Sequence, residues 1–179
     1  SLELAIRDAA QLLGKQVALE LHGGEVRIEA NVLSAVQDAL LHMVRNAVDH
    51  GIEAPAQRLR AGKEAQGHIR VTVQQRGRRV TFQCADDGCG IDVDAVREAA
   101  VARHVLSAEE AAALSPQEAL QLVFCAGVST SREVTEMSGR GVGLDVVREI
   151  ARRFHGEVSA ASTIGAGASI GLTVPTALS

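Results

Sequence analysis

A β-hairpin pattern in the middle of the chain restricts its fold more than any other feature. Apolar and polar residues alternate over 69–73 and again over 80–84, and Arg76-Gly77-Arg78 separates the two runs. A period of two residues predicts half-buried strands, and a short glycine-containing connection predicts that they pair. The alternation at 17–21 and the glycine turn after it predict another hairpin, with its second strand at 26–28. Two closing strands are predicted around Val158 and over 170–174.

Apolar residues that recur every three to four positions predict the helices. The longest covers 31–50, where Asn31 is expected to cap the first turn and Gly51 to end the helix. Residues 125–141 have little periodicity and many small residues, so they predict a mobile loop, which is the best candidate for a lid. The other predicted helices cover 2–13, a stretch from about Asp92, two short segments capped by Ser107 and Ser115, and 144–154.

Composition narrows the class of protein. A 179-residue chain that is 46% hydrophobic can bury one substantial core, so we expect a single domain over 1–179. A net charge of −4 and an aromatic content of 2% argue against nucleic acid as a partner. There is neither a run of ~20 apolar residues nor a signal peptide, so we expect a cytoplasmic protein without direct membrane insertion. Because Ser1 opens a helical pattern without an initiator Met, we expect a piece excised from a longer multidomain protein.

The stretch LHMVRNAVDHGIE, at the end of the long predicted helix, carries a stripe of polar residues. Asn46, Asp49 and His50 follow His42 by four, seven and eight residues, which places all four on one helical face. Polar residues on such a face are most often simply solvated. A zinc site of His42, Asp49 and His50 is conceivable, but the amide of Asn46 suits a hard cation such as Mg²⁺ better.

Three glycine-bearing stretches can carry chemistry. Asp86-Asp87-Gly88-Cys89-Gly90 leads from a strand into a helix, so its glycines would let the backbone approach a flat ligand closely. A carboxylate beside them could accept a hydrogen bond from an exocyclic amine of that ligand. An ordinary turn is the alternative. The stretch 138–144, SGRGVGL, opens a helix whose free N–H groups suit phosphate, with a flexible hinge as the alternative. The third, 165–168, is predicted to be a turn. The sequence contains no P-loop, no dinucleotide-binding fingerprint and no Ser or Cys in a nucleophile context.

Taken in order, these motifs resemble one family. Histidine kinases, gyrase, the MutL repair proteins and the heat-shock chaperone ATPases share the Bergerat ATP-binding fold, and the chain is similar to them in Asn46-Ala-x-Asp49, Asp86-x-Gly88-x-Gly90, Gly139-Arg-Gly141-Val-Gly143 and a glycine turn before the last strand. The chain is also similar to the catalytic domain of CheA-type chemotaxis histidine kinases, over about residues 2–175. The segments that carry this similarity are HMVRNAVDHGIE, DDGCGID, AGVST and SGRGVGLDVV. The resemblance implies an α/β fold, a two-layer sandwich of a mixed β-sheet and helices with ATP under a lid.

This resemblance implies ATP and Mg²⁺ as cofactors. Asn46 would ligate the Mg²⁺ that bridges the phosphates, and His42 would be the second catalytic residue. Asp86 would accept a hydrogen bond from the adenine amino group, while Gly88 and Gly90 would leave room for the ring. The other ATP-binding residues would be Arg45, Asp49, His50, Ser129, Thr130, Gly139, Arg140, Gly141, Val142, Gly143 and Leu144.

The residue at position 42 helps to choose an activity within the superfamily. Water-activating ATPases of this fold are similar in carrying a Glu one turn before the Asn, whereas this chain has His42, which favours phosphoryl transfer to a protein. None of the 6 His precedes an acidic residue, so we expect the acceptor histidine on a separate phosphoacceptor domain. The resemblance further implies a role in two-component chemotaxis signalling and a homodimeric full-length protein. A response regulator and a receptor-coupling protein would be indirect partners, reached through missing domains.

Several positions depart from the family pattern. Ala95 and Ala99 stand where lysines are common, and Ala168 stands where the last glycine turn usually has a Thr. In the predicted lid, Val128 replaces a second aromatic residue and Ser131 a basic one. These departures keep open an alternative function, an ATP-binding regulatory or scaffold module without efficient phosphotransfer.

Overall fold

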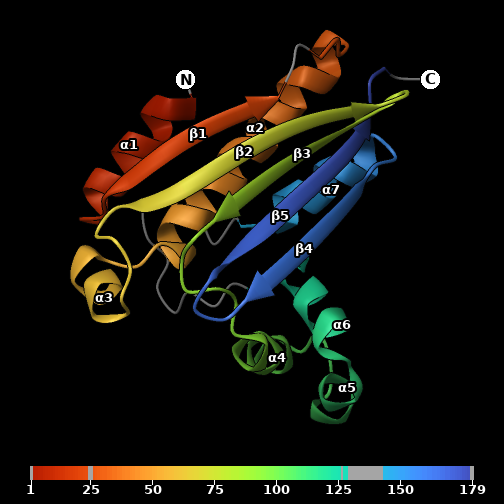
Figure 1. Ribbon diagram of the computed structural model, residues 1–179. Coiled ribbons are helices and arrows are strands. Elements are labelled where there is room, and N and C mark those ends of the chain that lie inside the picture. The colour runs from red at the N-terminus through yellow and green to blue at the C-terminus, as the bar shows by residue number, and fades with distance from the viewer. Residues whose placement is uncertain (1, 24–25, 126, 129–142, 178–179) are drawn as a thin grey trace.

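A five-stranded mixed sheet forms one layer of the molecule, and helices form the other (Figure 1). The computed structural model describes residues 2–23, 26–125, 127–128 and 143–177. β1 runs parallel to β2, and the other neighbouring strands are antiparallel. In spatial order the strands are β1 (Val17–Gly23), β2 (Gly67–Arg76), β3 (Arg79–Asp86), β5 (Gly167–Pro175) and β4 (Glu157–Thr163). The predicted α/β sandwich is confirmed.

Helices α2 and α7 lie behind the sheet in Figure 1, whereas α4, α5 and α6 gather beyond its lower end. A π-helix, η1, continues α2 without a break, and a 3₁₀-helix, η2, follows α6. The helices are α1 (Leu2–Leu12), α2 (Ala30–Asn46), η1 (Ala47–Gly51), α3 (Pro55–Arg60), α4 (Val93–Ala102), α5 (Ala108–Ala113), α6 (Pro116–Leu120), η2 (Gln121–Phe124) and α7 (Asp145–Arg153).

The core lies between the sheet and the α2–α7 pair. Val36 and Val44 project from α2 onto the inner face of the sheet, where Phe82 and Leu172 are also buried. Burying each such side chain contributes about 1.5–3 kcal/mol. The central strands β3 and β5 are therefore held against α2 by apolar packing.

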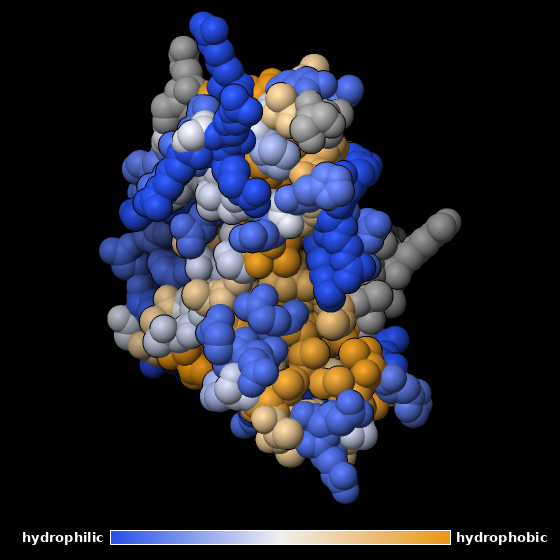
Figure 2. Space-filling model, turned by 90° about the vertical axis from the view of Figure 1, so that its right-hand side faces the viewer, coloured by the Kyte–Doolittle hydropathy of each residue, from blue (hydrophilic) through white to orange (hydrophobic). Residues whose placement is uncertain are grey.

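The surface differs between the two ends of the molecule. In Figure 2 hydrophobic residues reach the surface mainly in the lower part, at the level where Figure 1 places α4, α5 and α6. The partly buried side chains there include Leu106 and Leu114, which pack on a small second core around Val96 and Leu122. Within the described part of the chain, none of the helices combines the length and the apolar character that crossing a lipid bilayer requires.

The central hairpin and most helix starts agree with the sequence. β2 and β3 pair directly across the turn at Gly77, whose φ of 61° suits glycine. Ser107 and Ser115 each form the predicted capping box with the Glu three residues later. Asp92 caps α4 by accepting from two backbone N–H groups. These features need only a few neighbouring residues, which explains why the sequence predicts them.

Two local predictions were wrong. The hairpin predicted for 17–28 does not form, because β1 pairs in parallel with β2, and the crossover between them contains α2, η1 and α3. Residues 26–29 form no strand but lead into α2, and the Glu29 N–H donates to the Thr176 carbonyl at 2.9 Å. Asn31 is not the cap of α2, because the helix already begins at Ala30.

Candidate functional site

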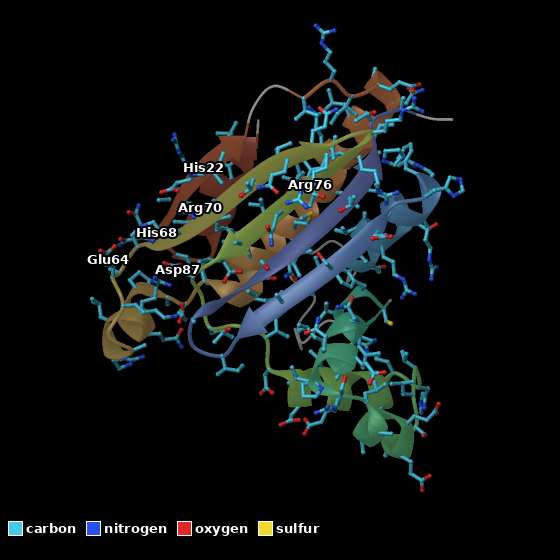
Figure 3. All side chains as sticks on the ribbon, turned by 45° about the vertical axis from the view of Figure 1, so that its right-hand side comes forward. His22, Glu64, His68, Arg70, Arg76 and Asp87 are labelled. Atoms are coloured by element: carbon cyan, nitrogen blue, oxygen red, sulfur yellow. The ribbon has the colours of Figure 1, made fainter. Side chains whose placement is uncertain are left out.

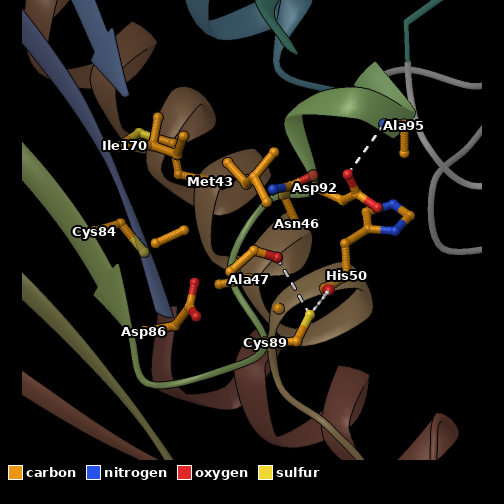
Figure 4. Close-up of a pocket in the computed structure, with 14 residues that line it drawn as sticks. Met43, Asn46, Ala47, His50, Cys84, Asp86, Cys89, Asp92, Ala95 and Ile170 are labelled. Atoms are coloured by element: carbon orange, nitrogen blue, oxygen red, sulfur yellow. Dashed lines mark hydrogen bonds between the residues drawn. The ribbon is translucent and has the colours of Figure 1, made fainter. Parts of the chain in front are cut away.

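A pocket of about 180 Å³ opens where β3 ends, between the α2–η1 helix and the start of α4 (Figure 4). Met43, Cys84 and Ile170 line its apolar floor, and its polar lining groups are Asn46, His50, Asp86, Cys89 and Asp92. Pockets that enclose a whole drug-sized ligand hold roughly 300–1,000 Å³. The pocket is thus sized for part of a ligand, such as one flat heterocycle.

Asp86 is the last residue of β3, and the pKa of its carboxyl group lies clearly above the ordinary value. Burial, with the negative charges of Asp87 and Glu53 adding to it, raises the pKa of Asp86 to about 6. Backbone N–H groups of Gly88 and Ala168 donate to the carboxylate and lower its pKa in part, the former at 2.8 Å. Near pH 7 the pocket therefore holds an ionised acceptor beside an apolar floor.

Glycines let the loop after β3 lie directly on the end of η1. A Cβ on Gly88 would lie 2.0 Å from the Gly51 carbonyl oxygen, and one on Gly51 would lie 2.9 Å from an Asp86 carboxylate oxygen. The Cys89 N–H donates to the same Gly51 carbonyl at 2.9 Å. Gly51 was predicted only as a helix end, yet its lack of a side chain brings the two halves of the pocket together.

We expect Gly88→Ala to lower the free energy of unfolding by roughly 1–3 kcal/mol, because its new methyl group would overlap the Gly51 carbonyl. Urea unfolding of the nucleotide-free chain measures this. Gly143→Ala is the matched control, since an added Cβ there meets no described atom within 4 Å. Equal stability of the two variants would contradict the close packing of Gly88 on Gly51.

The polar stripe is divided between the pocket and its surroundings. Asn46 and His50 line the pocket, whereas Arg45, His42 and Asp49 do not. A π-helical turn follows Asn46: the Ile52 N–H donates to the Ala47 carbonyl at 2.8 Å, five residues back, so the helix turns more slowly there. Of the four residues of the predicted stripe, the pocket lining thus contains two, Asn46 and His50.

His42 and Asp49 lie outside the pocket lining, and their electrostatic surroundings differ. Burial and the charge of Arg45 lower the pKa of His42, against the opposing charges of Asp145 and Asp38. An Asp49 carboxylate oxygen lies 3.3 Å from Nε2 of His50. Burial lowers the pKa of His50 although Asp49 opposes this. His50 is therefore disposed to be neutral at physiological pH.

Lys15 supports this end of the helix and was not singled out in the sequence. Its Nζ donates to the carbonyls of Val48 at 2.6 Å and Asp49 at 2.9 Å. These carbonyls lie near the helix end, where a cation is favourable. Burial lowers the pKa of Lys15, with Asp49 opposing. Sequence gives no signal for it, because its partners are backbone atoms more than thirty residues away.

Part of the predicted site lies outside the described residues: Ser129, Thr130, Gly139, Arg140, Gly141 and Val142. Gly143 and Leu144 are described. The Gly143 N–H donates to the Asp145 carboxylate at 3.0 Å, which fixes the start of α7. The Leu144 side chain is buried in the core, so only its backbone could face a ligand.

The donors in the pocket fit a hard cation better than zinc. In the described ranges no three His, Cys, Asp or Glu side chains come together as a metal site. The Asn46 amide lines the pocket and makes no hydrogen bond to any described residue, which leaves its oxygen available to a ligand. An amide oxygen is a suitable Mg²⁺ ligand.

Two of the departures from the family pattern face the same pocket. Ala95 and Ala168 both line it. Ala168 nevertheless contributes its backbone N–H to Asp86, so this contact does not depend on its side chain. Neither position supplies the cation or the hydroxyl expected there.

Comparison with known proteins now identifies the fold. Residues 35–178 match the family described as histidine kinase-, DNA gyrase B-, and HSP90-like ATPase. The chain belongs to this family. The structure is similar to full-length ShkA solved in complex with AMPPNP, with a TM-score of 0.56 at 22% identity over 100% of this chain and 31% of that one. This confirms the Bergerat-type fold that the motifs predict.

The sequence relatives of this ATPase-family chain include chemotaxis proteins. It is 43% identical to the chemotaxis protein CheA of Treponema pallidum over 97% of its own length. It is 41% identical to a gliding motility regulatory protein of Myxococcus xanthus, again over 97% of its length. The chain spans 21% and 22% of these two relatives. The CheA-type resemblance is thus confirmed for this ATPase-like region.

Proposed function

We propose that this chain binds ATP with Mg²⁺ and transfers the γ-phosphate to a histidine on a separate phosphoacceptor domain. It would serve as the catalytic domain of a CheA-like kinase in two-component chemotaxis signalling. One observation carries the proposal: the Asn46 amide, which has no hydrogen-bond partner among the described residues, and the Asp86 carboxylate line one pocket in a chain of this ATPase family. The fold shared with ShkA, solved with an ATP analogue, supports a nucleotide as the ligand.

In this proposal Asp86 receives the adenine ring. Its carboxylate accepts from the exocyclic amine, and a charge-assisted hydrogen bond in a partly dry pocket gives both affinity and base selectivity. Met43 and Ile170 supply the apolar surface for the ring. Gly88 and Gly90 let the loop beside the ring pack closely on the backbone of Gly51 and Thr163, where an added Cβ would meet a carbonyl oxygen.

The α2–η1 helix holds the phosphate end. Asn46 would bind Mg²⁺ through its amide oxygen, and the metal would supply neutralisation of phosphate charge. Arg45, Asp49, His50 and the glycine-rich stretch ending at Gly143 would surround the triphosphate. His42 would lie at the transfer end, since it precedes Asn46 by one helical turn.

The wider setting follows from the CheA-type relatives. The direct partner would be a phosphoacceptor histidine domain, and a response regulator and a receptor-coupling protein would be reached through other domains. A cytoplasmic location and a homodimeric full-length protein belong to the same proposal. Its support is the similarity to the Treponema pallidum CheA along nearly the whole chain.

Calorimetric titration of the chain with ATP, with and without Mg²⁺, tests the binding step. Incubation with [γ-³²P]ATP and a purified phosphoacceptor domain tests the transfer step. Mg²⁺-dependent binding together with a labelled acceptor supports the kinase. Binding without a labelled acceptor would favour the regulatory module. This module is the second candidate because Ala95 and Ala168 line the pocket in place of a lysine and a Thr.

We expect selectivity for ATP to decline as pH falls through about 6. Asp86 accepts from the adenine amine only when ionised, and its raised pKa puts protonation in this range, so acid removes the acceptor while pH above 7 leaves it intact. The measurement is the ratio of dissociation constants for ATP and purine riboside triphosphate, which lacks the amine. Because both nucleotides carry the same triphosphate, its titration cancels. A ratio constant from pH 5 to pH 8 would exclude Asp86 as the acceptor.

A further inference from the structure

Arg58 of α3 is buried, with a relative exposure of 1%, and it is the one buried charged residue found in the described part of the chain. Each nitrogen of its guanidinium has a partner. Nε donates to the Glu64 carbonyl at 2.7 Å, Nη1 to Glu53 at 2.9 Å and Nη2 to the Asp87 carboxylate at 3.1 Å. A buried cation is tolerated only with such complete pairing. The groups around Arg58 are therefore arranged to bind its guanidinium.

Lys63 adds a second cation on the same side of the loop after β3. Its Nζ donates to Glu53 at 2.7 Å, to the Asp87 carbonyl at 3.0 Å and to the Gly88 carbonyl at 2.8 Å. Arg58 Nη1 also donates to the Asp87 carbonyl, at 3.1 Å. Two side chains from the α3 region thus bind two successive backbone carbonyls of the loop.

The hydrogen bonds of Arg58 and Lys63 affect the pocket through the geometry of the peptide groups that they bind. The Asp87 carbonyl and the Gly88 N–H belong to one planar trans peptide and point in opposite directions. Binding the carbonyl from the α3 side directs the N–H to the Asp86 carboxylate, which it meets at 2.8 Å. In the next peptide, Lys63 binds the Gly88 carbonyl, and the Cys89 N–H donates to Gly51 at 2.9 Å.

The carboxylate of Asp87 is held away from the pocket. The His68 backbone N–H donates to it at 2.8 Å, and Nδ1 of His68 lies 3.0 Å from its other oxygen. Figure 3 labels the two residues side by side at this end of the sheet. Burial would raise the pKa of Asp87, but the hydrogen bonds from His68 and the charge of Arg58 lower it overall. Of the two adjacent aspartates, one is fixed outside and the other lines the pocket.

We propose that Arg58 and Lys63 are positioning residues that orient the Gly88 peptide and, through it, the Asp86 carboxylate for base recognition. The inference rests on the proposed function, since it concerns how the adenine acceptor is held. Neither side chain lines the pocket, so their effect on a nucleotide passes through the loop.

Lys63→Met tests this in the full chain. We expect it to weaken ATP binding about tenfold, the loss typical of a misplaced charge-assisted hydrogen bond, and to leave purine riboside triphosphate binding nearly unchanged. Arg58→Lys keeps the charge but cannot reach all its partners, so the same loss of selectivity is expected. Arg60→Met is the matched control, because Arg60 is exposed on the same helix.

A second readout needs no nucleotide. Hydrogen exchange of the Gly88 amide should be about tenfold faster in Lys63→Met than in the wild type and unchanged in Arg60→Met. If the wild type bound no ATP, the proposed function would fail while this readout still judged the role of Lys63 and Arg58. Unaltered Gly88 exchange, or equal weakening of both nucleotides, would overturn the positioning role.

Discussion

Asp86→Asn should weaken MgATP binding about 30- to 100-fold, the largest effect on affinity that we expect from a single substitution. The change removes the charge that strengthens the hydrogen bond from the adenine amine, a contribution of about 2–3 kcal/mol. In the wild type the backbone N–H groups of Gly88 and Ala168 donate to the Asp86 carboxylate. In the variant one of these donors would face the amide N–H₂ group, which is a donor itself. Calorimetric titration of both proteins with MgATP gives the ratio.

Asp94→Asn provides the matched control for the Asp86 experiment. The Asp94 side chain has a relative exposure of 85% and, among the described residues, pairs with Arg97 alone, on the surface of α4. It should bind MgATP as the wild type does. Wild-type affinity in Asp86→Asn as well would remove Asp86 from the nucleotide site and with it the observation on which the proposed function rests.

Asn46→Asp should reduce phosphotransfer at least about a hundredfold, a loss typical of removing one group that stabilises charge in a transition state. A carboxylate here adds a negative charge beside the triphosphate and changes a neutral Mg²⁺ ligand into a charged one. Asn46 makes no hydrogen bond to the rest of the described chain, so its substitution should not disturb the fold. The measurement is the initial rate of label transfer at several Mg²⁺ concentrations.

Asn31→Asp makes the same chemical change near the other end of α2, where the side chain is exposed. It should transfer phosphate at the wild-type rate. If Asn46→Asp did so too, with an unchanged Mg²⁺ requirement, the metal would have to be held elsewhere. A rate lost without any shift in Mg²⁺ dependence would point to repulsion of the triphosphate alone.

Several elements could be predicted because their causes are local. The β2–β3 hairpin follows from strict alternation around Gly77, and the capping boxes at Ser107 and Ser115 each involve four successive residues. The resemblance also led to Asp86 and Asn46, which the structure brings into one pocket. Motif order could indicate this because the ends of β3 and α2 meet at the same place in the fold.

Other features depend on partners far away in the chain. β1 was predicted to form a hairpin, but its partner is β2, some 50 residues later, and a parallel pairing leaves no turn signal beside the strand. Residues Arg58 and Lys63 carry no motif of their own, and their partners at Asp87 and Gly88 are 24–29 residues away. Only the folded chain shows that such charges face a backbone carbonyl.

The sequence by itself determined the family, the strand–loop–helix setting of Asp86 and the placement of Asn46 at the end of a long helix, because short motifs encode these features. Only the tertiary structure decided which polar residues of that helix share the pocket. His50 lies beside Asn46 in the pocket lining and Asp49 does not, although the helical period of 3.6 residues places both on the same face as Asn46. The orientation of the Asp86 carboxylate was likewise decided by tertiary contacts, since planar peptides transmit the hold of Arg58 and Lys63 into the pocket.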